Sequence, residues 1–261
     1  MKNHTSSIFR LFALAALSAF MLIENGVAAP QNQAQEPVIG SSRSLELNEK
    51  ATAAAQAGDL KKAETLLREA ISDDTKNLTA AFNLASVYLQ TNRGNEAVKL
   101  LQQYVSEYSE DAGLFARLGD AYYSTKRPAD AINSYEKALS LDPSFPKISA
   151  RVGTLYSISE RFDDAIRMYL TAVEQEPRNS EYLANLSNLF LVANQPDKAI
   201  SAAKRALQVA PTSQLYRTLG SAYEKIKDID SSLIAYKRAQ DLGDKSDELE
   251  DKISALRKVK G

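Results

Sequence analysis

Apolar residues recur at helical spacing in short stretches of this chain, and polar breaks separate one stretch from the next. The clearest stretch contains Leu114, Phe115, Leu118, Ala121 and Tyr122. After a break at Lys126–Arg127, a second stretch contains Ala131, Ile132, Tyr135, Ala138 and Leu139. Pro128 suits the first turn of a second helix, where its missing N–H is not needed. The Asp142–Pro143 pair ends that helix, because a residue before proline is disfavoured in helical conformation, so the pattern predicts a helical hairpin.

The same pattern returns every 34 residues. Five alanines keep this spacing, namely Ala63, Ala97, Ala131, Ala165 and Ala199. Aromatic residues and prolines keep it too, at Tyr88, Tyr122, Tyr156 and Phe190 and at Pro143, Pro177 and Pro211. Self-similarity at a fixed period is the signature of a stacked array, in which each unit buries its apolar face against its neighbours. Small residues at one register position let the helix backbones approach closely.

Residues 112–145 resemble one tetratricopeptide repeat (TPR). The matching residues are Phe115, Leu118, Gly119, Tyr122, Ala131, Tyr135, Ala138 and Pro143. The six predicted units in this register are 44–77, 78–111, 112–145, 146–179, 180–212 and 213–246. In the last unit Gly220 and Tyr223 come one residue early, which predicts a shorter turn after Pro211. The resemblance implies an all-α fold, a right-handed superhelical solenoid of six helix-turn-helix TPR units.

Some units depart from the repeat pattern, and the end of the chain leaves it. Ala51, Ala85 and Ser187 stand at the glycine position, and Ala203 replaces the second aromatic residue of the fifth unit. Residues 247–261 place three apolar side chains on one helix face with charges elsewhere, at Leu249, Ile253 and Leu256. This pattern predicts a C-terminal capping helix, which a solenoid needs to cover its last open face.

The N-terminal segment has the layout of a secretory signal. Lys2 and Arg10 precede thirteen apolar or small residues at 11–23, and a short polar stretch then leads to Ala28. This apolar run is shorter than the roughly 20 residues of a membrane-spanning helix. We therefore expect a signal peptide at residues 1–28, cleaved after Ala28, and a periplasmic or otherwise secreted protein; the alternatives are an uncleaved anchor and an N-terminal helix. Residues 29–43 are rich in Gln, Pro, Ser and Gly, which predicts a flexible linker.

Composition argues against catalysis. The chain has no cysteine, and its one histidine, His4, lies in the segment expected to be removed. The mature chain would lack the residues of common general-base catalysis and of His/Cys metal sites, so we expect no enzyme activity, no cofactor and no metal. Removing residues 1–28 removes Lys2, Arg10 and Glu24, which changes the net charge from −1 to −2. This near-neutral balance argues against nucleic acid as a partner.

The resemblance implies a concave groove lined by the first helix of each unit. Carried over by register, the predicted groove residues are Asn83, Arg117, Tyr123, Lys147, Arg151, Asn185 and Asn188, with Leu89, Ile158 and Leu191 beside them. Lys147 and Arg151 are four apart, expected on one helix face, and resemble half of the two-carboxylate clamp with which some family members hold acidic peptide C-termini. Phe82 and Ser86 replace the Lys and Asn of its other half. Guanidinium groups beside apolar side chains suit peptides that carry carboxylates; the alternative is a solvated helix face with ion pairs such as Arg117 with Asp120.

The sequence therefore predicts a non-catalytic interaction scaffold or adaptor that is exported and has no stable membrane span once mature. Its expected partner is a protein of an envelope assembly that presents a peptide or helix, with an acidic or carboxylate-bearing segment, to the groove. The alternative is a self-assembling structural scaffold, in which the groove accepts part of a second copy. Six units behind a signal resemble the tetratricopeptide pilotins and exopolysaccharide-assembly scaffolds of Gram-negative envelopes, although those pilotins carry a lipidated cysteine.

Overall fold

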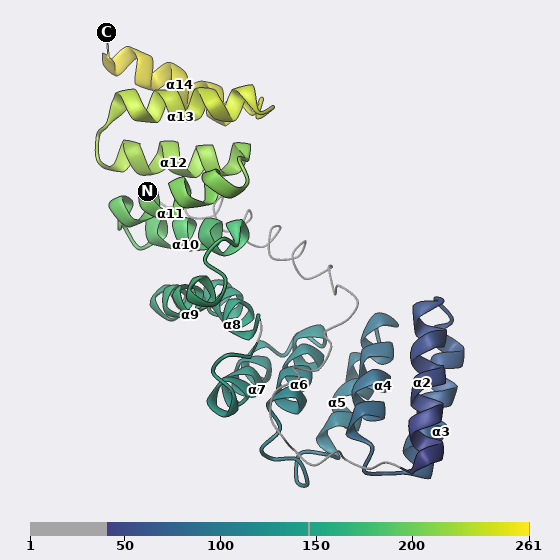
Figure 1. Ribbon diagram of the computed structural model, residues 1–261. Coiled ribbons are helices and arrows are strands. Elements are labelled where there is room, and N and C mark those ends of the chain that lie inside the picture. Colours follow the sequence, from purple (N-terminus) through teal and green to yellow (C-terminus); the bar gives the residue numbers. More distant parts are fainter. Residues whose placement is uncertain (1–40, 146, 261) are drawn as a thin grey trace. The chain divides into compact units, whose positions relative to one another are not determined.

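A computed structural model describes residues 41–145 and 147–260, and within them it contains thirteen α-helices and no strand (Figure 1). The helices are α2 (Ser42–Gln56), α3 (Leu60–Asp73), α4 (Leu78–Gln90), α5 (Gly94–Gln102), α6 (Ala112–Ser124), α7 (Pro128–Leu141), α8 (Ile148–Ile158), α9 (Phe162–Gln175), α10 (Ser180–Val192), α11 (Pro196–Val209), α12 (Ser213–Lys225), α13 (Ile229–Asp241) and α14 (Asp247–Lys260). The predicted signal peptide and nearly all of the predicted linker lie outside the described residues. The predicted all-α fold is confirmed.

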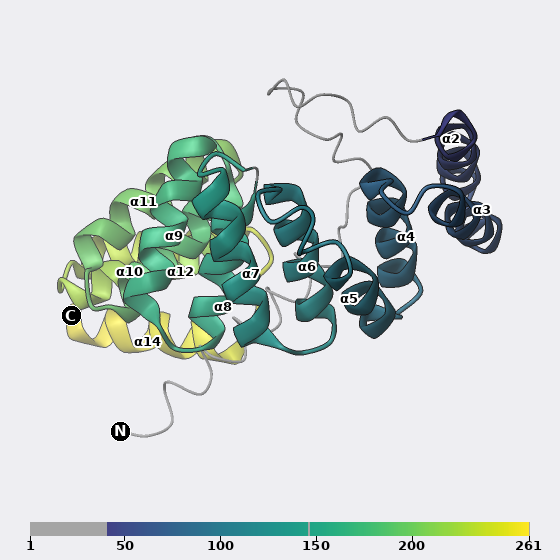
Figure 2. The same cartoon turned by 90° about the horizontal axis from the view of Figure 1, so that it is seen from below.

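The described chain divides into two compact units, residues 41–148 and residues 149–260. The N-terminal unit contains α2 to α7, and the C-terminal unit contains α8, apart from its first residue, to α14. Within each unit consecutive helices pack as antiparallel hairpins, and the first helices of neighbouring hairpins also touch. These first-helix contacts join α2 to α4, α4 to α6, and α10 to α12 (Figure 2).

Caps and prolines set the ends of the helices. The side chains of Asp59, Asn77 and Asp111 each accept a hydrogen bond from a backbone N–H in the first turn of the helix that follows. Pro128 and Pro196 occupy the first turns of α7 and α11, as the sequence predicts. The turn between α11 and α12 is also shorter, since only Pro211 separates the residues that flank these helices, Ala210 and Thr212.

The turn inside most hairpins places a residue other than glycine in the left-handed region. These residues are Asn92, Lys126, Glu160, Asn194 and Lys227, with φ between 55° and 62°. Each follows the end of a first helix, the place where glycine is usual because it has no Cβ to clash. In the first hairpin the corresponding residue is Gly58, with φ 81°.

The repeating alanines lie where the two helices of a hairpin meet. Ala63, Ala97, Ala131, Ala165 and Ala199 are all 0% exposed. Their positions confirm the expectation that small residues at this register position allow close helix packing.

Each hairpin also pairs a residue of its first helix with the residue sixteen positions later in its second helix. Gly119 faces Tyr135, and a Cβ added at Gly119 would lie 2.5 Å from the tyrosine ring. Gly220 faces Tyr236 in the same way, also at 2.5 Å. Where the glycine is replaced, the partner is smaller: Ala51 with Leu67, Ala85 with Leu101, and Ser187 with Ala203. Among these pairs tyrosine thus occurs only where the facing position is glycine, because its ring lies where a Cβ would otherwise be.

Helix α14 covers the last hairpin of the C-terminal unit. Leu249, Ile253 and Leu256 form one apolar cluster with Leu233, Tyr236 and Ala239 of α13. All three α14 residues are buried, as the sequence predicts, and the opposite side of the helix is charged. The fold class, with its capping helix, is therefore as predicted.

Candidate protein-interaction face

In each unit the first helices carry polar side chains, some of which bond to one another between neighbouring hairpins. We call these residues the first-helix face; it consists of Asn48, Asn83, Ser86 and Arg117 in the N-terminal unit and of Arg151, Asn185, Asn188 and Thr218 in the C-terminal unit. In the N-terminal unit, Asn83 Nδ2 donates to Asn48 Oδ1 (2.8 Å) and Arg117 Nη1 donates to Ser86 Oγ (3.1 Å). In the C-terminal unit, Thr218 Oγ1 donates to Asn188 Oδ1 (2.8 Å). These bonds fix several predicted groove residues in position.

Arg117 of the N-terminal unit lies against an aromatic ring. Its guanidinium carbon lies 4.8 Å from the centroid of the Phe82 ring, a distance typical of cation–π contacts. Its side chain is partly exposed. Asp120 accepts a hydrogen bond from Tyr135 at 2.5 Å. Tyr123, also predicted for the groove, is half-buried, and burial raises the pKa of its phenol.

The expectation that Lys147 and Arg151 share one helix face is wrong. Helix α8 begins at Ile148, and Lys147 precedes it with a positive φ of 64°. A residue in the left-handed region interrupts a right-handed helix, so α8 begins only after Lys147. Lys147 belongs to the N-terminal unit and Arg151 to the C-terminal unit. Lys147 therefore does not lie on the face of α8 that carries Arg151.

In the C-terminal unit, Arg151 and Asn185 are close to buried tyrosines. Burial raises the pKa of Tyr182 to about 12, and the positive charge of Arg151 opposes this rise. Asn185 Nδ2 donates to the hydroxyl oxygen of Tyr169 (3.0 Å), and burial raises the pKa of that phenol as well. Both phenols stay neutral at physiological pH. This hydrogen bond thus joins Asn185 of α10 to α9 of the preceding hairpin.

A shallow hollow of about 250 Å³ lies between α10 and α12. Its lining combines small, aliphatic and polar side chains: Ser180, Glu181, Ala184, Asn188, Ala210, Thr212, Gln214, Leu215 and Thr218. The hollow belongs wholly to the C-terminal unit. Among the predicted groove residues it contains Asn188, whose amide is held by Thr218.

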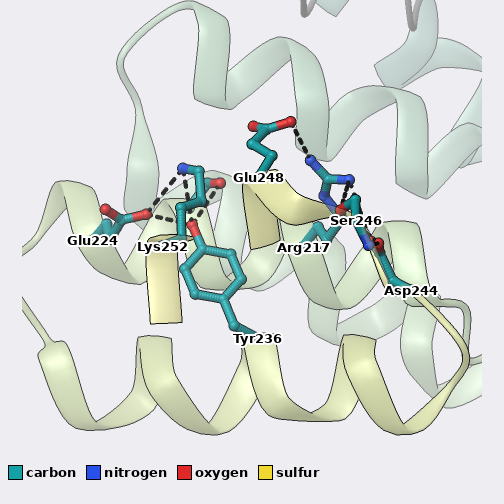
Figure 3. Close-up of polar contacts among 8 residues, drawn as sticks. Arg217, Glu224, Tyr236, Asp244, Ser246, Glu248 and Lys252 are labelled. Atoms are coloured by element: carbon teal, nitrogen blue, oxygen red, sulfur yellow. Dashed lines mark hydrogen bonds and ion pairs between the residues drawn. The ribbon is translucent and has the colours of Figure 1, made fainter. Parts of the chain in front are cut away.

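Two polar clusters join the capping helix to α12 and α13 (Figure 3). Arg217 of α12 pairs with Asp244 (3.2 Å) in the turn between α13 and α14, and with Glu248 (2.9 Å) of α14. Tyr236 donates to Glu224, and Lys252 Nζ lies 3.3 Å from both Glu224 Oε2 and the Tyr236 hydroxyl. Burial, and then the Glu224 carboxylate, raise the pKa of Tyr236. Sequence reasoning missed these residues, although α14 begins 34 residues after α12, where a further first helix would begin.

A second missed feature is an arginine at the turn inside each of three hairpins, α4–α5, α6–α7 and α8–α9. Arg93, Arg127 and Arg161 stack on Tyr88, Tyr122 and Tyr156, with the guanidinium carbon 4.2–4.5 Å from the ring centroid. Each arginine also pairs with a carboxylate three residues later, at Glu96, Asp130 and Asp164. The signal was present in the sequence, because the arginines are themselves 34 residues apart. These contacts brace the turn between the two helices.

Neither a metal centre nor a membrane helix is found in the described part of the chain. No group of three or more His, Cys, Asp or Glu side chains between residues 41 and 260 is placed to hold a metal ion. Of the helices α2 to α14, none is both long and apolar enough to cross a membrane.

Solved structures with a similar fold are TPR proteins. The crystal structure of MamA aligns with a TM-score of 0.57 and 20% identity, over 60% of this chain and 92% of that chain. YrrB, described as a TPR protein with an unusual peptide-binding site, aligns with a TM-score of 0.56 and 19% identity, over 66% of this chain and 89% of that chain. At these identities the likeness concerns the fold. No curated protein sequence matches the chain.

Sequence models of the tetratricopeptide repeat match most of the chain. One covers residues 54–118, a second covers residues 112–145, and a third covers residues 153–213 and again 184–247. Proteins built from this repeat bind protein partners and are typically not catalysts. The chain belongs to the tetratricopeptide repeat family.

Proposed function

We propose that this protein is an exported adaptor that binds a peptide or helix of an envelope-assembly partner along its first-helix face. The observation that carries the proposal is the set of hydrogen bonds between neighbouring first helices, at Asn48–Asn83, Ser86–Arg117 and Asn188–Thr218. Polar groups that are already held in place lose less conformational entropy when a partner binds. The peptide-binding site described for YrrB, which has a similar fold, further supports peptide recognition.

Photo-crosslinking in the native envelope tests the binding face. A photoreactive residue would replace Thr79 of α4 or Gln214 of α12, both exposed on first helices. Matched controls would replace Asn133 of α7 and Glu174 of α9, which are exposed on second helices. We expect a protein crosslink from the first-helix positions and none from the controls. Crosslinks from the second-helix positions alone would overturn the proposal.

Charge reversal tests the contribution of the cations. Arg117→Glu with Arg151→Glu should weaken binding of the crosslinked partner about ten- to a hundredfold, the effect of losing a charge-assisted contact of about 1.5–3 kcal/mol. The loss should shrink as salt rises, because exposed charges are screened. The control is Lys61→Glu with Lys62→Glu on α3, where both lysines are exposed. Lys137 is a poorer control, since it is partly buried with its ammonium 5.8 Å from the Phe115 centroid.

Export is tested separately. N-terminal sequencing of the native protein should find a chain that begins near Ala29, because the segment before it has the charged, apolar and cleavable layout of a signal. A native protein that still contains residues 1–28 would refute the proposed export. The proposal for the binding face would not be affected.

A self-assembling scaffold is the alternative, and light scattering at micromolar concentration separates the two functions. A monomer supports the adaptor, whereas growth in mass with concentration supports the scaffold. One observation disfavours stacking onto the first hairpin. Lys50 stands exposed on α2 where Leu84, Leu118 and Leu186 stand buried in later first helices.

A further inference from the structure

We infer that the hollow between α10 and α12 binds one aliphatic side chain of an extended peptide that also carries a lysine or arginine close by. This inference rests on the proposed peptide-binding function and names the chemistry of the partner for the C-terminal unit. It departs from the carboxylate-bearing peptide that Arg117 and Arg151 favour.

The size of the hollow fits part of a peptide. At about 250 Å³ it is smaller than the roughly 300–1,000 Å³ of pockets that enclose a whole small ligand. It exists because small residues line it: Ser180 and Ala184 on α10 and Ala210 at the end of α11, with Leu215 contributing the aliphatic surface. Phe82 fills the position in α4 that Ala184 occupies in α10. The lining therefore suits one aliphatic side chain.

A hydrogen-bond donor stands beside this apolar surface. The side-chain oxygen of Asn188 accepts a hydrogen bond from Thr218 (2.8 Å), which orients the amide. Its Nδ2 group makes no hydrogen bond to any residue that the structure describes. A main-chain carbonyl of an extended peptide can accept from this group, whereas the carbonyls inside a helix are already bonded. The geometry thus favours an extended segment over a helical one.

The charge at the rim of the hollow is negative. Glu181 is exposed at the start of α10, and its carboxylate has no ion pair within residues 41–145 and 147–260. Gln214 stands on α12 as an uncharged residue of the same lining. A cation on the peptide would pair with Glu181 without displacing an existing partner. Charge complementarity of this kind selects lysine or arginine over an acidic residue.

The test uses the purified protein and a set of synthetic peptides. The reference peptide is acetyl-Gly-Ser-Leu-Lys-Ser-Gly-amide, compared with versions in which alanine replaces the leucine or glutamate replaces the lysine. Amide chemical shifts of the isotope-labelled protein report both affinity and location. We expect shifts at the hollow for the reference peptide and about tenfold weaker binding for either changed version, the size of losing one buried side chain or one charge-assisted contact.

Variants of the hollow complete the test. Ala184→Leu fills it and Asn188→Ala removes the donor, and each should weaken the reference peptide about tenfold; Glu181→Lys should reverse the preference between the lysine and glutamate peptides. The control is Ser201→Leu, the same kind of enlargement at an exposed site of α11. If Ala184→Leu unfolds the hairpin, Asn188→Ala and Glu181→Lys still test whether the reference peptide binds at the hollow.

Two results would overturn the inference. One is unchanged affinity in all three variants, and the other is a set of shifts confined to another surface, including a contact with a second copy of the chain. Neither result would remove crosslinks from Thr79 and Gln214, so failure of this inference is distinguishable from failure of the proposed function.

Discussion

Replacing Gly119 by alanine should destabilise the protein, although the same change in an ordinary helix stabilises it. Gly119 lies inside α6, and its added Cβ would be 2.5 Å from both Cδ1 and Cε1 of Tyr135. Separations below about 3.4 Å are already tight for such carbons, whose optimum is about 3.5–4.0 Å. Tyr135 is 0% exposed, and its hydroxyl is bonded to Asp120, so the ring has little room to move.

The magnitude follows from two opposed effects. Alanine is favoured over glycine in a helix interior by about 0.8–1 kcal/mol. Overpacking of a buried site costs about 1–3 kcal/mol, and displacement of a fully buried ring belongs in the upper part of that range. We therefore expect Gly119→Ala to lower the free energy of unfolding by about 1–2 kcal/mol.

A double mutant isolates the contact itself. Tyr135→Leu alone leaves a cavity and removes the hydrogen bond from Tyr135 to Asp120, with an expected loss of about 2–4 kcal/mol. Combined with Gly119→Ala, it recreates the alanine–leucine pairs that the chain already uses at Ala51 with Leu67 and at Ala85 with Leu101. The double mutant should thus be at least about 1 kcal/mol more stable than the two single losses predict, which is a coupling typical of residues in contact.

Urea unfolding followed by circular dichroism measures these differences. Repeat arrays can unfold in steps, so hydrogen exchange of the α6–α7 hairpin should accompany the midpoint. The control is Gly113→Ala in the same helix, where the added Cβ would lie 3.6 Å from Phe82 and 3.1 Å from the Asp111 carboxylate. That change should be neutral or mildly stabilising. A stabilising effect of Gly119→Ala, or additive losses in the double mutant, would refute the reasoning.

Three further predictions concern the packed alanines, the turns and the cap. Ala131→Leu should destabilise by about 1–3 kcal/mol, whereas Asn133→Leu on the exposed side of α7 should change stability by less than about 0.5 kcal/mol; equal urea midpoints would contradict the packing role. Lys126→Gly should stabilise by about 0.5–1 kcal/mol in the same assay, because φ of 59° strains a side chain but not glycine. Burial works to raise the pKa of Asp244, but its bonds to Ser246 and Arg217 outweigh this and hold the pKa below its usual value. The Asp244 carboxylate therefore stabilises the folded protein fully above its unfolded pKa of about 3.9, and this stabilisation is lost as pH falls through the lower native pKa. Hydrogen-exchange protection of α14 should therefore fall below about pH 4 in the wild type and less steeply in Asp244→Asn.

The repeat register could be predicted from the sequence because packing recurs at fixed positions. The repeat positions of Ala131 and Gly119 need small residues because the two helices of a hairpin cross there. Small residues therefore recur every 34 residues, and this period indicates the repeated hairpin. The capping helix was predictable for a similar reason, since Leu249 and Ile253 have a one-sided apolar pattern.

The candidate site was less accessible to sequence reasoning. Family register places a residue on a helix, but it does not report that α8 starts late, so the position of Lys147 was missed. The repeat register also does not predict which side chains form hydrogen bonds with one another. Asn185 is engaged by Tyr169, and Asn188 is oriented by Thr218, because of contacts between helices that no local pattern records.

The paired residues sixteen positions apart bear on how such an array can be inherited. A whole hairpin carries both members of its pair, so duplication or exchange of a complete hairpin keeps each glycine with its tyrosine. Recombination inside the turn would instead join the first helix of one hairpin to the second helix of another, for example Ala85 to the partner of Gly119. Breakpoints between hairpins are therefore the ones that leave a foldable product, which makes the complete hairpin, rather than the single helix, the unit that evolution and protein engineering can move.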